Sequence, residues 1–148
     1  MSLMALIGCS VLLAGCASQS EVVFCPTISA PEEGARSFVR SDNTKQIFDI
    51  RLNGVNAVCT QHNSGGTMVA LSVGLKIKRS LAEGAENDVV AVPMMSAIVD
   101  ANQTVISNQE FGYRVGFDKG SDRKFPVADI EQLVPAEARL VISLRPAY

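Results

Sequence analysis

The chain has 148 residues and a formal net charge of −2, with 13 Lys and Arg against 15 Asp and Glu. The lack of a basic excess argues against a nucleic-acid-binding protein, and the hydrophobic fraction of 47% argues against a disordered chain. Aromatic residues make up only 5% and Trp is absent, so a platform for stacking sugars or bases is not expected. The length suits one domain with its own core.

The first fifteen residues carry no charge and are mostly apolar between Leu3 and Ala14. About 12 apolar residues are too few to span a bilayer, which takes about 20, but they fit the hydrophobic region of a secretory signal peptide. The segment ends in Leu13-Ala14-Gly15-Cys16, which resembles the lipobox of bacterial lipoproteins. The resemblance implies cleavage before Cys16, diacylation of its sulfur and often acylation of its new amino group. Cys9 is the alternative site, but cleavage there would leave a hydrophobic region of only about six residues.

The lipobox divides the chain into three parts. We expect a signal peptide over residues 1–15, a lipidated tether over residues 16–21 and a single domain over residues 22–148. In bacterial lipoproteins an Asp after the lipidated Cys typically favours the inner membrane, and this chain has Ala17 there. The resemblance therefore implies an outer-membrane lipoprotein facing the periplasm, with the inner membrane as the alternative. The covalent lipid on Cys16 would be its membrane contact, and no other cofactor is expected.

Two cysteines remain after processing, Cys25 and Cys59. An even number of thiols in an oxidising compartment indicates a disulfide, and free buried thiols are the alternative. Two distant thiols and His62 do not supply the ligands of a metal site, so we expect no metal. The chain has no C-x-x-C motif, which argues against a thiol oxidoreductase.

The domain is patterned mainly as strands. Residues 26–43 are rich in Pro, Gly, Ser and charge, so we expect a long connection with one helical turn near residues 32–38. Alternating residues flank Asn53-Gly54, a strong hairpin signal. From Val69 to Ile77 every second residue is a branched aliphatic, a spacing that one face of a helix does not give.

The second half of the domain continues this pattern. Residues 89–99 are apolar on both faces and predict a buried strand, in which Pro93 indicates a bulge or an edge. A strand over residues 104–117 follows. One short helix is predicted near residues 126–134, because Val127, Ile130 and Val134 share a helical face and Pro135 would end it. The last predicted strand contains Leu140, Ile142 and Leu144.

Six or seven strands without any β-α-β unit predict an all-β fold. We expect an antiparallel two-sheet sandwich, immunoglobulin-like in its layers, and a small open barrel is the alternative. Cys25-Pro26, Val58-Cys59 and the basic-ended run Val69–Arg79 also resemble a group of small proteobacterial envelope lipoproteins. That group has no established activity, so this resemblance informs the fold and not the chemistry.

Candidate catalytic residues are few. His62 is the single His and lies close to Ser64 in a predicted turn, where neighbouring residues rarely reach the geometry of a catalytic triad. The acidic residues of the loops lack the spacing of a calcium site. No nucleophile elbow, phosphate loop or zinc motif is present, so we predict no enzymatic activity.

A small basic cluster is the one candidate binding feature. Lys76 and Lys78 share a face of the Val69–Arg79 strand, and Arg79 follows. The cluster could contact anionic headgroups or a cell-wall polymer. The alternative is a charged outer face that only prevents strands from pairing at the edge.

Together these features predict a membrane-anchored, periplasm-facing lipoprotein. It would act as a non-catalytic interaction or structural module of an envelope assembly, with a protein partner in the cell envelope and no nucleic acid. A carrier that binds an apolar ligand in a β cavity is an alternative, although aromatic residues are sparse. A hydrolase acting on envelope polymer is a further alternative, although a nucleophile–base pair is missing.

Substitution of Cys16 tests the anchor. We expect Cys16→Ser to release the protein from membranes, because two or more acyl chains give stable attachment whereas one gives only marginal binding. Incorporation of labelled fatty acid and fractionation of the membranes measure the effect. Label that still enters the Cys16→Ser variant would contradict the prediction and point to Cys9.

Overall fold

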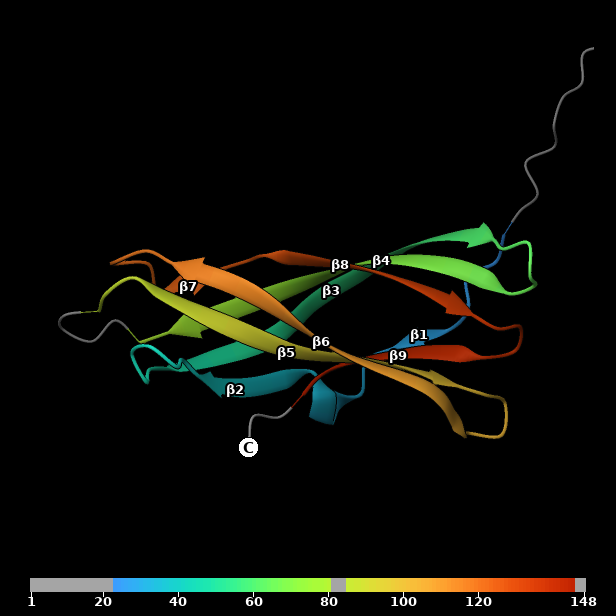
Figure 1. Ribbon diagram of the computed structural model, residues 1–148, viewed down its shortest axis with the longest axis horizontal. Coiled ribbons are helices and arrows are strands. Elements are labelled where there is room, and N and C mark those ends of the chain that lie inside the picture. The colour runs from blue at the N-terminus through green and yellow to red at the C-terminus, as the bar shows by residue number, and fades with distance from the viewer. Residues whose placement is uncertain (1–22, 81–84, 146–148) are drawn as a thin grey trace, which may run out of the picture.

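The structure is a computed structural model and describes residues 23–80 and 85–145. The predicted signal peptide, the lipidation site Cys16 and the tether 16–21 lie outside these residues. The described chain forms two β-sheets that pack on one another (Figure 1). The strands are β1 (Ile28–Ser29), β2 (Arg36–Arg40), β3 (Ile47–Gln61), β4 (Thr67–Arg79), β5 (Asp88–Val99), β6 (Val105–Phe117), β7 (Arg123–Lys124), β8 (Val127–Val134) and β9 (Arg139–Leu144). The predicted all-β sandwich is confirmed.

The two sheets differ in strand order. Sheet A has the order β1-β9-β5-β6, and sheet B has the order β2-β3-β4, with β7 and β8 both pairing with the far side of β4. Neighbours are antiparallel, except that the two residues of β1 pair in parallel with β9. The segment expected as a connection, residues 26–43, contains β1, β2 and a single 3₁₀ turn, η1 (Glu32–Gly34).

Strand β4 supplies the centre of the core. Its inward row runs from Val69 to Ile77, and each of these five aliphatic side chains is at most 1% exposed. Sheet A contributes the facing layer, which includes the fully buried Val90, Val92, Leu140 and Ile142. Burial of apolar side chains between two sheets is the dominant stabilising term in such a fold. The strict alternation of β4 therefore also decides which of its residues face solvent.

The predicted helix near residues 126–134 is wrong. These residues form β8, which pairs with Thr67–Gly74 of β4. Ala128 and Val134 face the core, and so does Gln132, which is 7% exposed and whose Oε1 has no hydrogen-bond partner among the described residues. A polar residue at an inward position hides the period of two. Pairing with the free side of β4 outweighs the helical spacing of the apolar residues, because it satisfies the backbone of both strands.

Pro93 lies in β5, a central strand of sheet A rather than an edge, and the register shift of this strand is at Ile98/Val99. The carbonyl of Pro93 accepts a hydrogen bond of 3.0 Å from the backbone amide of Arg145, just beyond the end of β9. Pro93 has no amide hydrogen to return, so the carbonyl of Arg145 needs another donor. The hydroxyl of Ser37 in sheet B donates to it at 3.0 Å. The missing ladder bond thus becomes a contact between the sheets.

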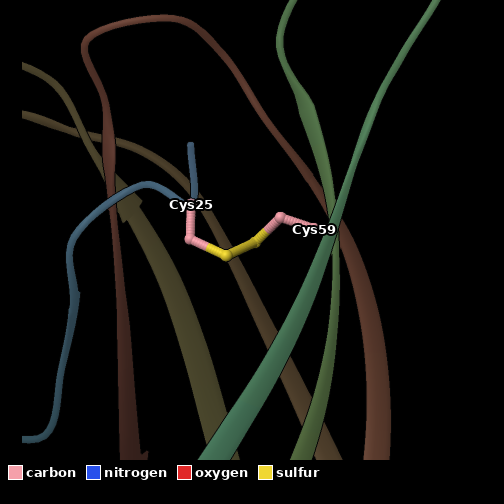
Figure 2. The surroundings of a disulfide bond; sticks show 2 residues. All are labelled: Cys25 and Cys59. Carbon is pink, nitrogen blue, oxygen red and sulfur yellow. A yellow bond between two sulfur atoms is a disulfide. The ribbon is translucent and has the colours of Figure 1, made fainter. Parts of the chain in front are cut away.

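The predicted disulfide between Cys25 and Cys59 is confirmed. The two Cα atoms are 5.4 Å apart, and the bridge closes a sequence separation of 34 residues. Figure 2 shows it reaching from the segment that precedes β1 to strand β3. Since β1 belongs to sheet A and β3 to sheet B, the bridge ties the edge of one sheet to the other. We call this end of the sandwich the disulfide end.

Removal of the bridge should destabilise the domain. We expect the double variant Cys25→Ala/Cys59→Ala to lose about 2–4 kcal/mol of unfolding free energy, because the unfolded chain regains the entropy of an open loop. Urea unfolding with and without a reductant measures this loss. The reductant should lower the stability of the parent protein and leave the double variant unchanged; equal stability of the two proteins would contradict the prediction.

Candidate interaction surface

The outer face of sheet B gathers basic side chains from four strands. The cross-strand register places Arg36 opposite Arg51 and Arg51 opposite Lys76, and it places Lys78 between Asp49 and Arg123. Arg40 lies on the same face of β2, so six cations share this surface with Asp49. We call it the basic face: Arg36, Arg40, Arg51, Lys76, Lys78 and Arg123, together with Asp49.

Asp49 lies at the centre of the basic face and pairs with two arginines. Arg36 donates to it from Nε at 2.8 Å and from Nη2 at 3.0 Å, and Nη2 of Arg51 donates at 3.2 Å. The hydrogen bonds from Arg36 are the main reason why the pKa of the Asp49 carboxyl is lowered; burial opposes them, and the hydrogen bond and charge of Arg51 add to the lowering. Among the described residues Lys76 and Lys78 form no ion pair. Their charges are therefore available to an anionic partner.

Two large apolar side chains are exposed within the basic face. Phe38 is 52% exposed and Ile47 is 53% exposed, on the neighbouring strands β2 and β3. The guanidinium of Arg36 lies 4.5 Å from the centre of the Phe38 ring, which is a cation–π contact. A groove of about 650 Å³ runs between these side chains and is lined by Phe38, Ile47, Asp49, Lys78, Arg79, Ser80, Asp122 and Arg123. Such a groove offers both apolar contact and positive charge.

The other half of the same outer surface has a different character. Val58 on β3 is 68% exposed, and Ser72 on β4 donates to the carboxylate of Asp129 on β8 at 2.7 Å. Glu131 lies two residues further along β8 and is exposed. The outer face of sheet B is thus basic toward one end and acidic toward the disulfide end, so the positive charge is localised.

Arg79 does not belong to the exposed cluster that was predicted with Lys76 and Lys78. It faces the core side of β4 and is 5% exposed. Its guanidinium donates to the carbonyls of Ser121 at 2.7 Å, Glu86 at 2.8 Å and Asp118 at 2.8 Å, and it lies 5.3 Å from the ring of Phe117. These bonds engage all three guanidinium nitrogens with loop backbone, so Arg79 holds the loops together beneath the groove and is not an exposed cation like Lys76 and Lys78.

Asp88 makes a second buried polar contact at the end opposite the disulfide. Asp88 is only 3% exposed. Its carboxylate accepts hydrogen bonds from Ser41 Oγ at 2.5 Å, from Thr44 Oγ1 at 2.5 Å and from the Val89 amide at 2.8 Å. Burial raises the pKa of Asp88, but these hydrogen bonds and the charge of Arg79 outweigh it, so the pKa of Asp88 is lowered overall. Asp88 of sheet A thereby fastens the loop between β2 and β3 of sheet B. We call this the Asp88 end.

His62 and Ser64 are close, but in a turn. Ser64 Oγ lies 2.7 Å from His62 Nδ1, and the amide of Ser64 donates to the same nitrogen at 3.3 Å. Both contacts lie within the exposed turn that joins β3 to β4. Since Nδ1 accepts from the backbone of its own turn, the pair stabilises that turn.

In the part of the chain that the structure describes, no group of three or more His, Cys, Asp or Glu residues could hold a metal ion. No helix within residues 23–80 and 85–145 is long and apolar enough to cross a membrane. Comparison of the chain with models of known families, with curated proteins and with solved structures gives no significant match.

The sequence predicts only part of the basic face. Lys76 and Lys78 follow from their alternation on one strand. Arg36, Phe38 and Arg40 carry the same period-two signal, and so does the run from Ile47 to Arg51, but the Pro, Gly and charged residues around the first of these segments favour a connection. The register that aligns the three runs joins distant parts of the sequence, so it was visible only in the structure.

Asp88→Asn should change how stability depends on pH. The folded-state pKa of Asp88 is lowered, so the stability that its charge contributes is present above the unfolded pKa of about 3.9 and is lost as pH falls through the folded value. We expect the variant to be about 1–3 kcal/mol less stable at pH 7, with a smaller difference at pH 3. Urea unfolding at the two pH values measures this. Asp42→Asn, an exposed residue of the same loop, is the control and should change little; an equal loss in both variants would contradict the role of Asp88.

Proposed function

We propose that the protein is a membrane-anchored, periplasm-facing lipoprotein that serves as a non-catalytic interaction module of an envelope assembly. The lipobox-like run Leu13–Cys16 supports the anchor. The Cys25–Cys59 bridge supports export, because disulfides form and persist in oxidising compartments. We further propose an outer-membrane location, on the resemblance to lipoproteins that lack Asp at the residue after the lipidated Cys.

The basic face is the observation that carries this proposal. It places cations around two half-exposed apolar side chains, Phe38 and Ile47, on a sheet surface that the described chain leaves open. Surfaces that bind partners often combine apolar anchors with a charged rim, and the charges raise the association rate and select the partner. The chemistry of the basic face fits an anionic envelope protein that also presents an apolar side chain.

The position of the basic face suits a partner beyond the membrane surface. Cys25 and Thr27 lie at the disulfide end, where Thr27 accepts a backbone hydrogen bond from Leu140 at 2.9 Å. Strand β4 runs from there to the Asp88 end over 13 residues, which is roughly 40 Å at about 3.3 Å per residue. A tether of a few residues would hold the disulfide end close to the lipid. The groove beside Phe38 and Lys78 would then face the periplasm.

The space between the sheets favours an interaction module over a carrier. Side chains of both sheets fill it, including the facing Phe48 and Phe117, whose ring centres are 5.0 Å apart. A lipid carrier needs a large apolar cavity. The groove on the basic face lies outside the core and is lined mainly by polar residues.

Photo-crosslinking in intact cells tests the basic face. A photoreactive amino acid at Phe38 of the full chain should crosslink to an envelope protein, and one at Val58 should not, although both positions are exposed on the outer face of sheet B. Lys76→Glu/Lys78→Glu should lower the yield at position 38 about tenfold, because the reversed charges repel an anionic partner. Thr60→Glu adds charge at the other end of the sheet and should leave the yield unchanged. Equal crosslinking from positions 38 and 58 would contradict the proposal.

A further inference from the structure

Sheet A has one long free edge, strand β6. Its 13 residues pair with β5 on one side and with no described strand on the other. The strand contains neither Pro nor Lys, and its first six residues, 105–110, are exposed on both faces. Proteins commonly protect such an edge with a short strand, Pro, Lys or a bulge, since a regular edge presents a row of unpaired amides and carbonyls. The one register shift of β6 lies at its start, between Val105 and Ser107, so the edge from Asn108 onward is regular and suited to receive another strand.

The contacts of Pro93 identify which residues offer those groups. The carbonyl of Pro93 accepts from Arg145 beyond β9, so the backbone groups of Pro93 point away from β6. Gly112, which lies opposite Pro93, consequently directs its own amide and carbonyl away from β5 and toward the free edge. Because the direction alternates along a strand, Asn108, Glu110, Arg114 and Gly116 present their backbone groups at the same edge.

We propose that β6 pairs with β6 of a second copy of the chain, antiparallel and with Gly112 opposite Gly112 of that copy. In this register Glu110 lies opposite Arg114 of the second copy, and Arg114 lies opposite Glu110. Phe111 and Tyr113, which are half-buried on the inner face of the strand, are likewise opposite one another across the interface. Cross-strand pairs of opposite charge and of aromatic residues stabilise an antiparallel ladder.

The charges of Glu110 and Arg114 favour this register over the two registers shifted by two residues in either direction. Centring the pair on Glu110 or on Arg114 would place two like charges directly opposite. Arg114 forms no ion pair with any described residue, and Glu110, whose side chain is 52% exposed, is held at 2.5 Å by Arg145 on its own outer face. Arg114 is thus unpaired among the described residues, and the half-exposed Glu110 would receive it as a second cationic partner. The two residues lie on the same surface, two positions either side of the symmetry axis.

The outer face of β6 beside this edge has room for side chains. A Cβ built on Gly112 or on Gly116 meets no atom within 4 Å. The pairing would join two copies of sheet A edge to edge and leave the outer face of sheet B uncovered. The interface is therefore separate from the basic face, and either of the two proposals can fail without the other.

Cysteine substitution in the full chain, expressed in intact cells, tests the register. Gly112→Cys should give a disulfide-linked dimer on a non-reducing gel, because opposed Cα atoms in an antiparallel pair are about 5.5 Å apart, within the range for a disulfide. Gly116→Cys is the matched control. It lies on the same strand and face, but its counterpart would be about 27 Å away, eight residues along the strand at about 3.4 Å each. We expect at least a tenfold difference in dimer yield between the two variants.

A charge swap in the Gly112→Cys background tests the pairing itself. Glu110→Arg alone and Arg114→Glu alone should each lower the dimer yield severalfold, since each sets like charges opposite one another. The combination Glu110→Arg/Arg114→Glu should restore the yield. A monomeric Gly112→Cys variant, equal yields from positions 112 and 116, or no rescue by the swap would each overturn the proposal; a monomer would leave the edge to a strand of another protein.

Discussion

Burial of one face of β4 is the constraint on which the other features depend. Strands β3, β7 and β8 all pair with β4, and its inward aliphatic row is fully buried against sheet A. With a side-chain period of two, the residues between must face solvent. Lys76 and Lys78 are outside for this reason, and the register of β4 with its neighbours brings Asp49, Arg51 and Arg123 beside them. A shift of one residue would bury the lysines, so the core fixes the surface chemistry.

The two ends of the sandwich are held by different means. At the Asp88 end, buried charges bind backbone and hydroxyl groups of the loops, with Arg79 donating to three carbonyls. Such groups tolerate burial because their polar atoms are paired. At the disulfide end the Cys25–Cys59 bond holds the two sheets together, close to the start of the described chain. A force applied through an anchor there would act on a crosslinked edge and not on the two-residue strand β1 alone.

Sheet A and sheet B offer two separate surfaces. The free edge of β6 presents backbone groups, whereas the outer face of sheet B presents cations and two exposed apolar side chains. Pro93 affects both sheets. Because it has no amide hydrogen, the carbonyl of Arg145 accepts from Ser37 of sheet B instead. Because its backbone groups point away from β6, the amide and carbonyl of Gly112 point toward the free edge. An edge suited to self-pairing and a face suited to an anionic partner can act together, because neither covers the other.

The sequence by itself determined the class of fold, the alternation of β4 and the cysteine pair, since each rests on local spacing or on simple counting. It predicted Lys76 and Lys78 as outward-facing for the same reason. The hairpin predicted at Asn53-Gly54 is wrong: β3 continues through these residues as one strand with a register shift at Leu52/Val55, because both of its halves pair with β4. The sequence did not predict the strands whose conformation depends on pairing with a distant segment. Residues 126–134 contain β8, which pairs with the otherwise free side of β4, and the predicted connection contains β2, which pairs with the edge of β3. Arg79 follows Lys78 directly, but the alternation along β4 places it on the inner face, where its guanidinium donates hydrogen bonds to three backbone carbonyls. Only the tertiary structure decided the basic face and the free edge, because both arise from register between segments far apart in the chain.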